Sequence, residues 1–184
     1  MGSPKPLLPL GDRPVVCRCV DYLVRGGVED IVAVLGHDAC DLEAALSGLP
    51  LSFAYNPEPE SDMAGSVRAG LRALSGDVGG VLVCLVDHPL VSARTVRTLL
   101  NHRARYPDCI AIPVFQGRKG HPSLFPRAVL DELSGASTLR DLVRRDANRV
   151  RLLEVEDAGV LMDMDTPRDY ERALAIWEGG GGEL

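Results

Sequence analysis

Residues 80–89 read GVLVCLVDHP, the most apolar run in the chain, closed by an acid, an imidazole and a proline. A continuous aliphatic run that ends at turn-forming residues is typical of a strand buried on both faces of a parallel sheet. We therefore predict a central strand over residues 80–86 that delivers Asp87 to its carboxyl end. Ligands of open α/β sheets bind at that end, where a carboxylate suits Mg²⁺. The competing interpretation is that Asp87 only turns the chain or caps the next helix.

The composition places this strand in a single aliphatic domain. The 184 residues are 46% hydrophobic but only 4% aromatic, so the core must consist mainly of Val, Leu, Ala and Ile. This excludes a disordered chain and suits parallel strands covered by helices. The formal net charge is −6 and the arginines are scattered, which predicts no nucleic-acid partner. No apolar stretch has the length of a membrane span, so no membrane partner is expected.

Cysteine usage indicates a reducing compartment. The five cysteines, at positions 17, 19, 40, 84 and 109, are an odd number and include no CxxC pair. We expect them to be reduced, small and mostly buried residues of a cytoplasmic protein. Their spacing does not favour a structural zinc site.

Helical and strand patterns alternate on both sides of the central strand. Helical spacing predicts helices over residues 13–25, 38–46, 63–74, 92–105, 127–133 and 138–145, with a last helix that begins at Pro167. The expected N-caps are Asp38, Ser92 and Ser137. Short apolar runs predict further strands over residues 30–35, 51–55, 109–115, 150–155 and 160–162.

The order of these elements predicts one α/β domain over residues 1–178, followed by a flexible tail over residues 179–184. A turn at residues 116–120 predicts that residues 121–125 run antiparallel to the strand before them. The expected architecture is a three-layer fold with a mainly parallel sheet and a late antiparallel hairpin. No internal repeat or domain linker interrupts it.

A second acidic motif, MDMDTP, occupies residues 162–167. Strand-like alternation would point Asp163 and Asp165 to one side and both methionines inward. If this segment lies near Asp87, one of the two carboxylates could complete a metal site. The alternative is a helix N-cap formed by Asp165 or Thr166, with Pro167 in the first turn. Capping accounts for one polar residue but not for two aspartates.

Two loops could also bind an anion. The stretch GRKGHP, residues 117–122, combines two glycines and two cations with His121, which could donate a hydrogen bond to a phosphate. Its simpler interpretation is a hairpin turn with solvated charges. The stretch from Asn56 to Ser66 leads from a Pro-rich acidic loop into a helix, whose first amides suit an anion or a base edge. Its simpler interpretation is a capped helix after a mobile loop.

Six stretches, in this order, resemble the MobA-like NTP transferases, and most closely their molybdenum cofactor cytidylyltransferase (MocA-like) branch. They span nearly the whole chain. One such stretch alone would be weak evidence for the family, but six in the family's order are specific for it. The stretches are MGSPKPLLPLGDRPV (1–15), VEDIVAVLGHD (28–38), NPEPESDMAGSVRAGL (56–71), VCLVDHPLV (83–91), GRKGHPSLF (117–125) and MDMDTPRDY (162–170).

The resemblance implies a Rossmann-like nucleotidyltransferase fold and a role for each matching residue. Lys5 is similar to the lysine that closes the family's phosphate loop, and Asp87 to its Mg²⁺ carboxylate. Asp165, or its neighbour Asp163, is similar to the second metal ligand. Asn56 and Ser66 resemble residues of the base side or nucleotide loop. His121 falls where the cytidylyltransferase branch has a residue close to the transfer site.

The implied activity is Mg²⁺-dependent transfer of CMP from CTP to the phosphate of a molybdopterin-type acceptor, with release of pyrophosphate. GTP, or another acceptor such as a sugar phosphate, is the alternative within the same class. The other alternative is a catalytically impaired nucleotide-binding accessory protein that assists a molybdoenzyme. The family's first strand and L-A-A-G-x-S-x-R loop would lie directly before Met1, so about 15 residues of the family pattern are expected to be missing. The expected oligomeric state is a monomer or a homodimer.

Overall fold

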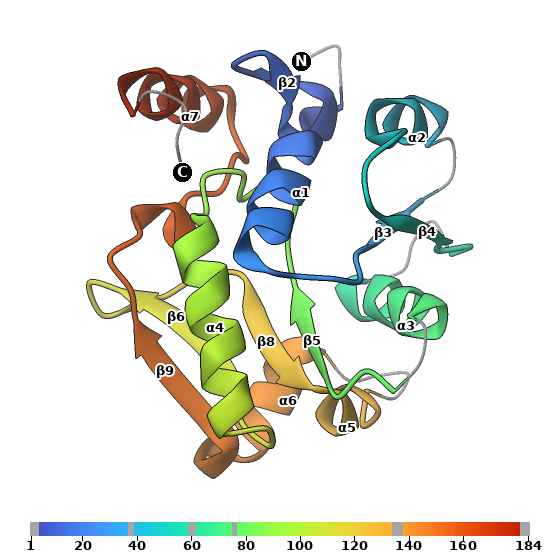
Figure 1. The fold of residues 1–184 in the computed structure, drawn as a ribbon, viewed down its shortest axis with the longest axis vertical. Helices are drawn as coiled ribbons and strands as arrows, with labels where there is room; N and C mark the ends of the chain where they lie inside the picture. The colour runs from blue at the N-terminus through green and yellow to red at the C-terminus, as the bar shows by residue number, and fades with distance from the viewer. Residues whose placement is uncertain (1–3, 37–38, 59–61, 75–76, 134–137, 181–184) are drawn as a thin grey trace.

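The structure is a computed structural model, and it describes residues 4–36, 39–58, 62–74, 77–133 and 138–180. The caps predicted at Asp38 and Ser137 and most of the predicted tail lie outside these residues. Three layers are visible, with helices on both faces of a central sheet (Figure 1). The α/β architecture predicted from the sequence is therefore confirmed.

The main sheet has the strand order β5 (Gly80–Val83), β8 (Ser123–Pro126), β6 (Ile110–Phe115), with β9 (Val150–Glu154) on the far side of β6. β8 pairs antiparallel with both β5 and β6, whereas β9 pairs parallel with β6. β5, β6 and β9 thus run in one direction and only β8 is reversed among these four, so the sheet is mainly parallel. Its carboxyl end on this side is where β5 delivers Asp87.

The late hairpin differs in detail from its prediction. β6 turns into β7 (Arg118–Lys119) through Gln116 and Gly117, both with positive φ, which is the geometry of a tight two-residue turn. β8 then runs antiparallel to β6, as predicted, but it meets β6 only where Ala111 faces Leu124. Its main partner is β5.

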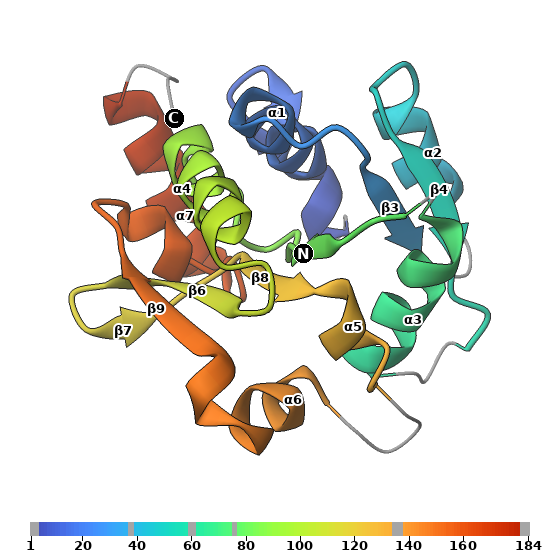
Figure 2. The same ribbon diagram turned by 60° about the horizontal axis from the view of Figure 1, so that its bottom comes forward.

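Helices cover both faces of this sheet, α4 (Ala93–Arg105) on one side and α5 (Arg127–Leu130) with α6 (Leu139–Arg145) on the other (Figure 2). On the first face, Leu99 of α4 packs on Ala111 and Leu124. On the other face, α3 (Met63–Ala73) joins α5 and α6 over β6 and β8. Ser92 caps α4 by accepting a hydrogen bond from Thr95, which confirms the predicted cap.

A second, smaller sheet stands beside the first. β3 (Val32–Leu35) and β4 (Ser52–Tyr55) pair parallel in register and are joined by α2 (Cys40–Leu46). α1 (Val15–Gly26) packs with α4 and with residues around β3 in one apolar cluster, and so bridges the two sheets. In Figure 1, β3 and β5 face each other below α1, but β3 pairs only with β4 and β5 only with β8 among the described residues.

The first and last described elements of the chain pack against each other. Residues before α1 form the one-turn helix η1 (Lys5–Leu7) and a small hairpin of β1 (Pro9–Leu10) and β2 (Arg13–Pro14). α7 (Pro167–Gly179) packs on that hairpin through the cluster that contains Leu10, Met164 and Ala173. Pro167 occupies the first turn of α7, which is closed by the capping box of Thr166 and Asp169.

Two predictions about local structure are wrong. Residues 160–162 are not a strand, because Ala158–Leu161 form the short helix η3, capped by the Asp157 side chain. The strand predicted over residues 80–86 ends at Val83, since residues beyond it have no strand partner. The helical turn η2 (Ala147–Arg149) leads into β9. Among the described residues, no helix is both long and apolar enough to cross a membrane.

Candidate functional site

Asp87 lies in the turn that follows β5, at the carboxyl end of the main sheet. The backbone N–H of His88 donates to the carbonyl of Leu85 at 3.3 Å and closes this turn. The Asp87 side chain is 32% exposed, yet its Oδ1 atom is buried and has no hydrogen-bond partner. A buried carboxylate oxygen without a donor is costly unless a ligand compensates it. Such an oxygen fits a role in holding a cation.

Two histidine rings lie beside Asp87. The ring centroids of His88 and His121 are 5.0 Å apart, and His88 Nε2 is 3.8 Å from Asp87 Oδ1. The Nδ1 atoms of both rings are buried without a hydrogen-bond partner. Burial, followed by the neighbouring His88 ring, lowers the pKa of His121, while Asp87 acts in the opposite direction. His121 is therefore a neutral ring at neutral pH, with one N–H available as a donor.

Packing of η3 brings His121 to this place. The His121 backbone N–H donates to the Val160 carbonyl at 2.8 Å, and the His121–Pro122 peptide bond is cis. A Cβ atom at Gly120 would come within 2.5 Å of that same carbonyl oxygen, so only glycine permits this approach. The close packing against Val160 therefore explains why glycine precedes His121 in the GHP motif.

Lys5 and Asp165, two predicted site residues, form an ion pair with Nζ and Oδ1 3.2 Å apart. Asp163 and Asp165 are both exposed, whereas Met164 between them is 1% exposed and Met162 packs on the same apolar cluster. The predicted alternation of acids outward and methionines inward is confirmed. The cap of α7 is Thr166, so neither aspartate is used for capping.

Asn56 and Ser66 are also brought together. The Asn56 side-chain amide donates to Ser66 Oγ at 3.1 Å, and its Oδ1 accepts from the Glu58 backbone at 3.2 Å. Asp62 caps α3 by accepting from Gly65 at 3.0 Å, so the helix begins before Ser66. These bonds brace the loop after β4 against α3.

Six of the seven predicted site residues come together in three places: Asp87 and His121 flank the His88 ring, Lys5 pairs with Asp165, and Asn56 donates to Ser66. The structure gives no such contact for the seventh, Asp163, within the described residues. Sequence reasoning assigned no role to His88, which lies between Asp87 and His121. Its position between the strand-end acid and Pro89 was the available signal. Within the described ranges, no three His, Cys, Asp or Glu side chains surround a common point. A Mg²⁺ site here would suit one or two carboxylates completed by nucleotide oxygens.

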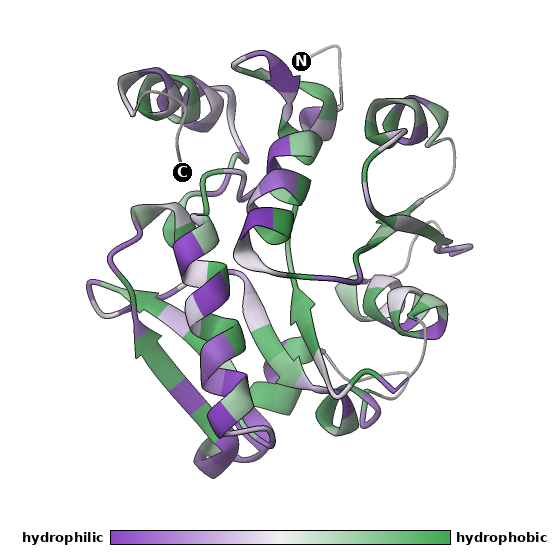
Figure 3. Ribbon diagram, in the orientation of Figure 1, coloured by the Kyte–Doolittle hydropathy of each residue, from purple (hydrophilic) through white to green (hydrophobic). Residues whose placement is uncertain are grey.

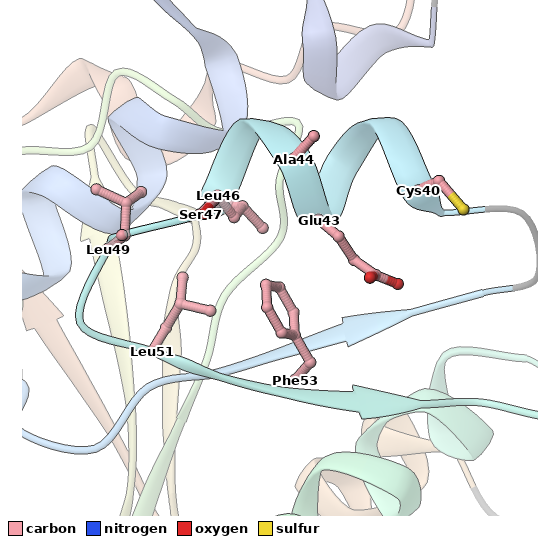
Figure 4. Close-up of a pocket in the computed structure, with 9 residues that line it drawn as sticks. Cys40, Glu43, Ala44, Leu46, Ser47, Leu49, Leu51 and Phe53 are labelled. Carbon is pink, nitrogen blue, oxygen red and sulfur yellow. The ribbon is translucent and has the colours of Figure 1, made fainter.

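Two hollows have linings that do not include Asp87, although Val86 next to it lines the larger one. The larger has a volume of about 760 Å³ and separates β3 from β5, with Ser66 at its wall. The smaller, about 460 Å³, lies between α2 and β4, where Leu51 and Phe53 point toward the helix (Figure 4). None of the predicted site residues lines the smaller hollow.

Residues 1–152 match the MobA-like NTP transferase domain. The chain belongs to this family. One relative, nicotine blue oxidoreductase of Paenarthrobacter nicotinovorans, is 31% identical over 184 residues, covering 94% of this chain and 88% of the relative.

Solved structures support the same assignment. A nucleotidyl transferase from Methanothermobacter thermautotroptrophicus is 25% identical, with a TM-score of 0.83 over 96% of this chain and 86% of that one. The protein Rv0371C of Mycobacterium tuberculosis H37Rv, solved in complex with manganese, is 29% identical with a TM-score of 0.76, over 95% and 93% of the two chains. The fold is therefore the Rossmann-like nucleotidyltransferase fold, and the MobA-like chain is a nucleotidyltransferase.

Proposed function

We propose that this MobA-like chain transfers CMP from CTP to the phosphate of a molybdopterin-type acceptor, with Mg²⁺ as the metal. The observation that carries the proposal is the buried, unpartnered Oδ1 of Asp87 at the end of β5, beside the rings of His88 and His121. The GHP form of the loop at His121 resembles that of the cytidylyltransferase branch, and this resemblance favours CTP over GTP.

The reaction needs no protein nucleophile. An oxygen of the acceptor phosphate attacks the α-phosphorus of CTP in line. A new phosphorus–oxygen bond forms, the bond to the β-phosphate oxygen breaks, and pyrophosphate leaves with the bonding electrons. Catalysis of this kind consists of positioning and charge stabilisation.

Each candidate site residue has a part in this scheme. Asp87, with Asp165 or Asp163, would hold Mg²⁺, which neutralises phosphate charge when bound. Lys5 neutralises charge on the triphosphate after it leaves Asp165. His121, held neutral by burial, donates its N–H to a phosphate oxygen near the transfer site. Asn56 and Ser66 are assigned to the base side of the nucleotide.

The name of the Paenarthrobacter relative suggests a redox activity, which needs an electron-carrying cofactor. The sequence of this chain has no GxGxxG motif of the kind that binds dinucleotides. The unpartnered carboxylate oxygen of Asp87 fits a phosphate–metal complex better than a hydride carrier. Nucleotidyl transfer is therefore the favoured chemistry.

The test is CTP and GTP binding by calorimetry with MgCl₂, followed by pyrophosphate release on addition of molybdopterin. We expect CTP to bind more tightly than GTP and Asp87→Asn to abolish Mg²⁺-dependent pyrophosphate release. Asp108→Asn is the matched control, because Asp108 is an exposed acid just before β6, at the opposite end of the sheet. Asp163→Asn and Asp165→Asn, compared side by side, identify the second ligand.

Three outcomes would contradict the proposal. Full turnover in Asp87→Asn would contradict the assignment of Asp87 as a Mg²⁺ ligand. Preference for GTP or for a sugar phosphate would retain the class and change the substrate. Binding of CTP without pyrophosphate release on any acceptor would favour an accessory protein that only carries nucleotide.

A further inference from the structure

β9 is an open edge strand of the main sheet. Among the described residues it pairs only with β6, and it lies at the outer margin of the sheet in Figures 1 and 2. Figure 3 shows that the strand is mainly hydrophobic, and Leu152 at its centre is 53% exposed. An exposed apolar residue on such an edge invites pairing with another chain. β9 is therefore a candidate binding surface.

The outward-facing backbone groups of β9 follow from its pairing with β6. The Val155 N–H donates to the Val114 carbonyl of β6 at 2.9 Å, and Val114 lies opposite Glu154 in the register of the two strands. Successive residues of a strand direct their backbone groups to opposite sides. Leu153 therefore faces β6 as Val155 does, whereas Leu152 and Glu154 face away. These two residues present N–H and C=O groups to any strand that lies beyond the edge.

The two faces of β9 differ in chemistry. Leu153 packs in the apolar cluster of α4, so Arg151, two positions earlier, lies on the α4 side. Val150 packs in the cluster of α6, which places Leu152 on the α6 side. Beside the open edge, one face thus presents a cation and the other an aliphatic side chain. A strand that alternates acidic and aliphatic residues complements both faces.

Cations gather on the α4 side of this edge. Burial lowers the pKa of the His102 ring, and the charges of Arg151 and Arg105 lower it further, so both arginines lie close to this ring. Arg151 donates to the backbone carbonyls of Asn148 and Val150. Among the described residues, no carboxylate pairs with Arg105 or Arg151. Their charge is therefore available to a ligand.

We call this surface the α4–β9 patch; it consists of Arg105, Tyr106, Arg151 and Leu152. Tyr106 is 51% exposed, and its ring centroid is 4.8 Å from that of His102. Tyrosine and arginine are enriched where proteins bind one another. The dipole of α4 favours a cation in its last turn, which accounts for Arg105 but not for Arg151 on β9. The patch is basic although the whole chain has a net charge of −6.

We propose that the α4–β9 patch binds an extended acidic segment of a partner protein, which adds to β9 as a further strand of the main sheet. Its acidic side chains would face Arg105 and Arg151, and its aliphatic side chains would cover Leu152. A second copy of this chain fits less well, because antiparallel pairing of β9 with itself would bring two Arg151 side chains to one face. The patch lies at the amino end of β9, whereas Asp87 follows the carboxyl end of β5, so the proposal is independent of nucleotide chemistry.

The test measures peptide binding to the full chain by fluorescence anisotropy. The labelled peptide Glu-Val-Glu-Leu-Glu-Val alternates acidic and aliphatic residues, and Lys-Val-Lys-Leu-Lys-Val reverses its charge. We expect the acidic peptide to bind at least about tenfold more tightly than the basic one, and NaCl to weaken its binding. Arg151→Glu and Arg105→Glu, on two different elements, should each lower its affinity at least about tenfold.

Arg172→Glu is the matched control for these variants. Arg172 is an exposed arginine of α7, an element far from the amino end of β9 in Figure 1, so this variant makes the same charge change without touching the patch. It should bind the acidic peptide as the parent does. Equal affinity of the parent, Arg105→Glu and Arg151→Glu for this peptide would overturn the proposal.

Hydrogen exchange followed by nuclear magnetic resonance tests the mode of binding. Exchange of the Leu152 and Glu154 amides should slow at least about tenfold in the peptide complex, because ladder hydrogen bonds must open first. Unchanged exchange would overturn strand addition. Two further results would also overturn the proposal: tighter binding of an oligouridylate of the same charge would make the partner a nucleic acid, and a dimer that protects these amides without peptide would make it a second copy.

Discussion

Lys5 and Asp165 stand 160 positions apart in the chain, and their side chains form an ion pair with Nζ and Oδ1 separated by 3.2 Å. The lysine belongs to η1 and the aspartate to the turn before α7. With 42% and 67% of the two side chains exposed, the pair lies in high dielectric and contributes little to stability. Lys5 and Asp165 can therefore bind a ligand instead of each other, because breaking their ion pair costs little free energy.

This predicts a separation between stability and activity. Lys5→Gln and Asp165→Asn should each leave the Tm nearly unchanged but lower pyrophosphate release by more than about tenfold, because each removes charge stabilisation of the triphosphate or its metal. Calorimetry of unfolding and a pyrophosphate assay on the same preparations measure both. A large fall in Tm with unchanged turnover would mean that the pair is structural.

Asp157 is expected to be a structural residue. Its carboxylate accepts hydrogen bonds from the Ser92 amide and hydroxyl at 2.9 and 2.8 Å, the Thr95 hydroxyl at 2.6 Å and the Gly159 amide at 2.9 Å. It thus ties η3 to the start of α4. Asp157→Ala should lower the free energy of unfolding by about 2 kcal/mol, because it leaves buried donors unpaired.

Urea unfolding measures this loss. Asp146→Ala is the control, because that carboxylate accepts one hydrogen bond, from the Asn148 amide, at an exposed helical turn. A loss no greater in Asp157→Ala than in Asp146→Ala would show that η3 is held by other contacts.

The cysteines should differ sharply in reactivity. Cys40 is exposed, whereas Cys17 and Cys19 are buried. Burial raises the pKa of the Cys84 thiol to about 12, so little thiolate forms at pH 8. Iodoacetamide at pH 8 should label Cys40 first, and Cys40→Ser should remove the fast phase. Labelling of Cys84 at the rate of Cys40, read by mass spectrometry, would contradict this.

Glu132 should make stability depend on acid pH. Its hydrogen bond from Arg149, and then that from Arg145, hold the pKa of this carboxyl below its ordinary value of 4.5. A lowered folded-state pKa stabilises the fold above the ordinary pKa, and this contribution disappears as pH falls through the folded-state pKa. Glu132→Gln should therefore lower the Tm at pH 7, and the difference should vanish in strong acid.

The control for Glu132 is Glu156→Gln. Glu156 pairs with Arg94 at 3.7 Å, and both side chains are at least 80% exposed, so its loss should leave the Tm unchanged at every pH. A difference between Glu132→Gln and the parent that persists below the folded-state pKa would indicate a packing effect instead of a charge effect.

Local chemistry made several features predictable. Ser92 before an amphipathic run, and Pro167 in a first turn, have the same meaning in any fold, and both are confirmed. The alternation of Met164 with its acidic neighbours also follows from strand-like backbone and is confirmed. The prediction of a strand over residues 160–162 is wrong because Asp157, which lies outside the apolar run, accepts a hydrogen bond from the Gly159 amide and starts a helical turn.

The sequence by itself determined the alternation of helices and strands, the delivery of Asp87 by an apolar strand and the family motifs, because these depend on neighbours along the chain. Only the tertiary structure decided that His88 joins Asp87 and His121, that Lys5 meets Asp165, and that β5 faces β3 across an open groove. Such contacts depend on which surfaces pack together. The period-2 pattern along one strand shows which of its faces is buried, but not which other strand it pairs with.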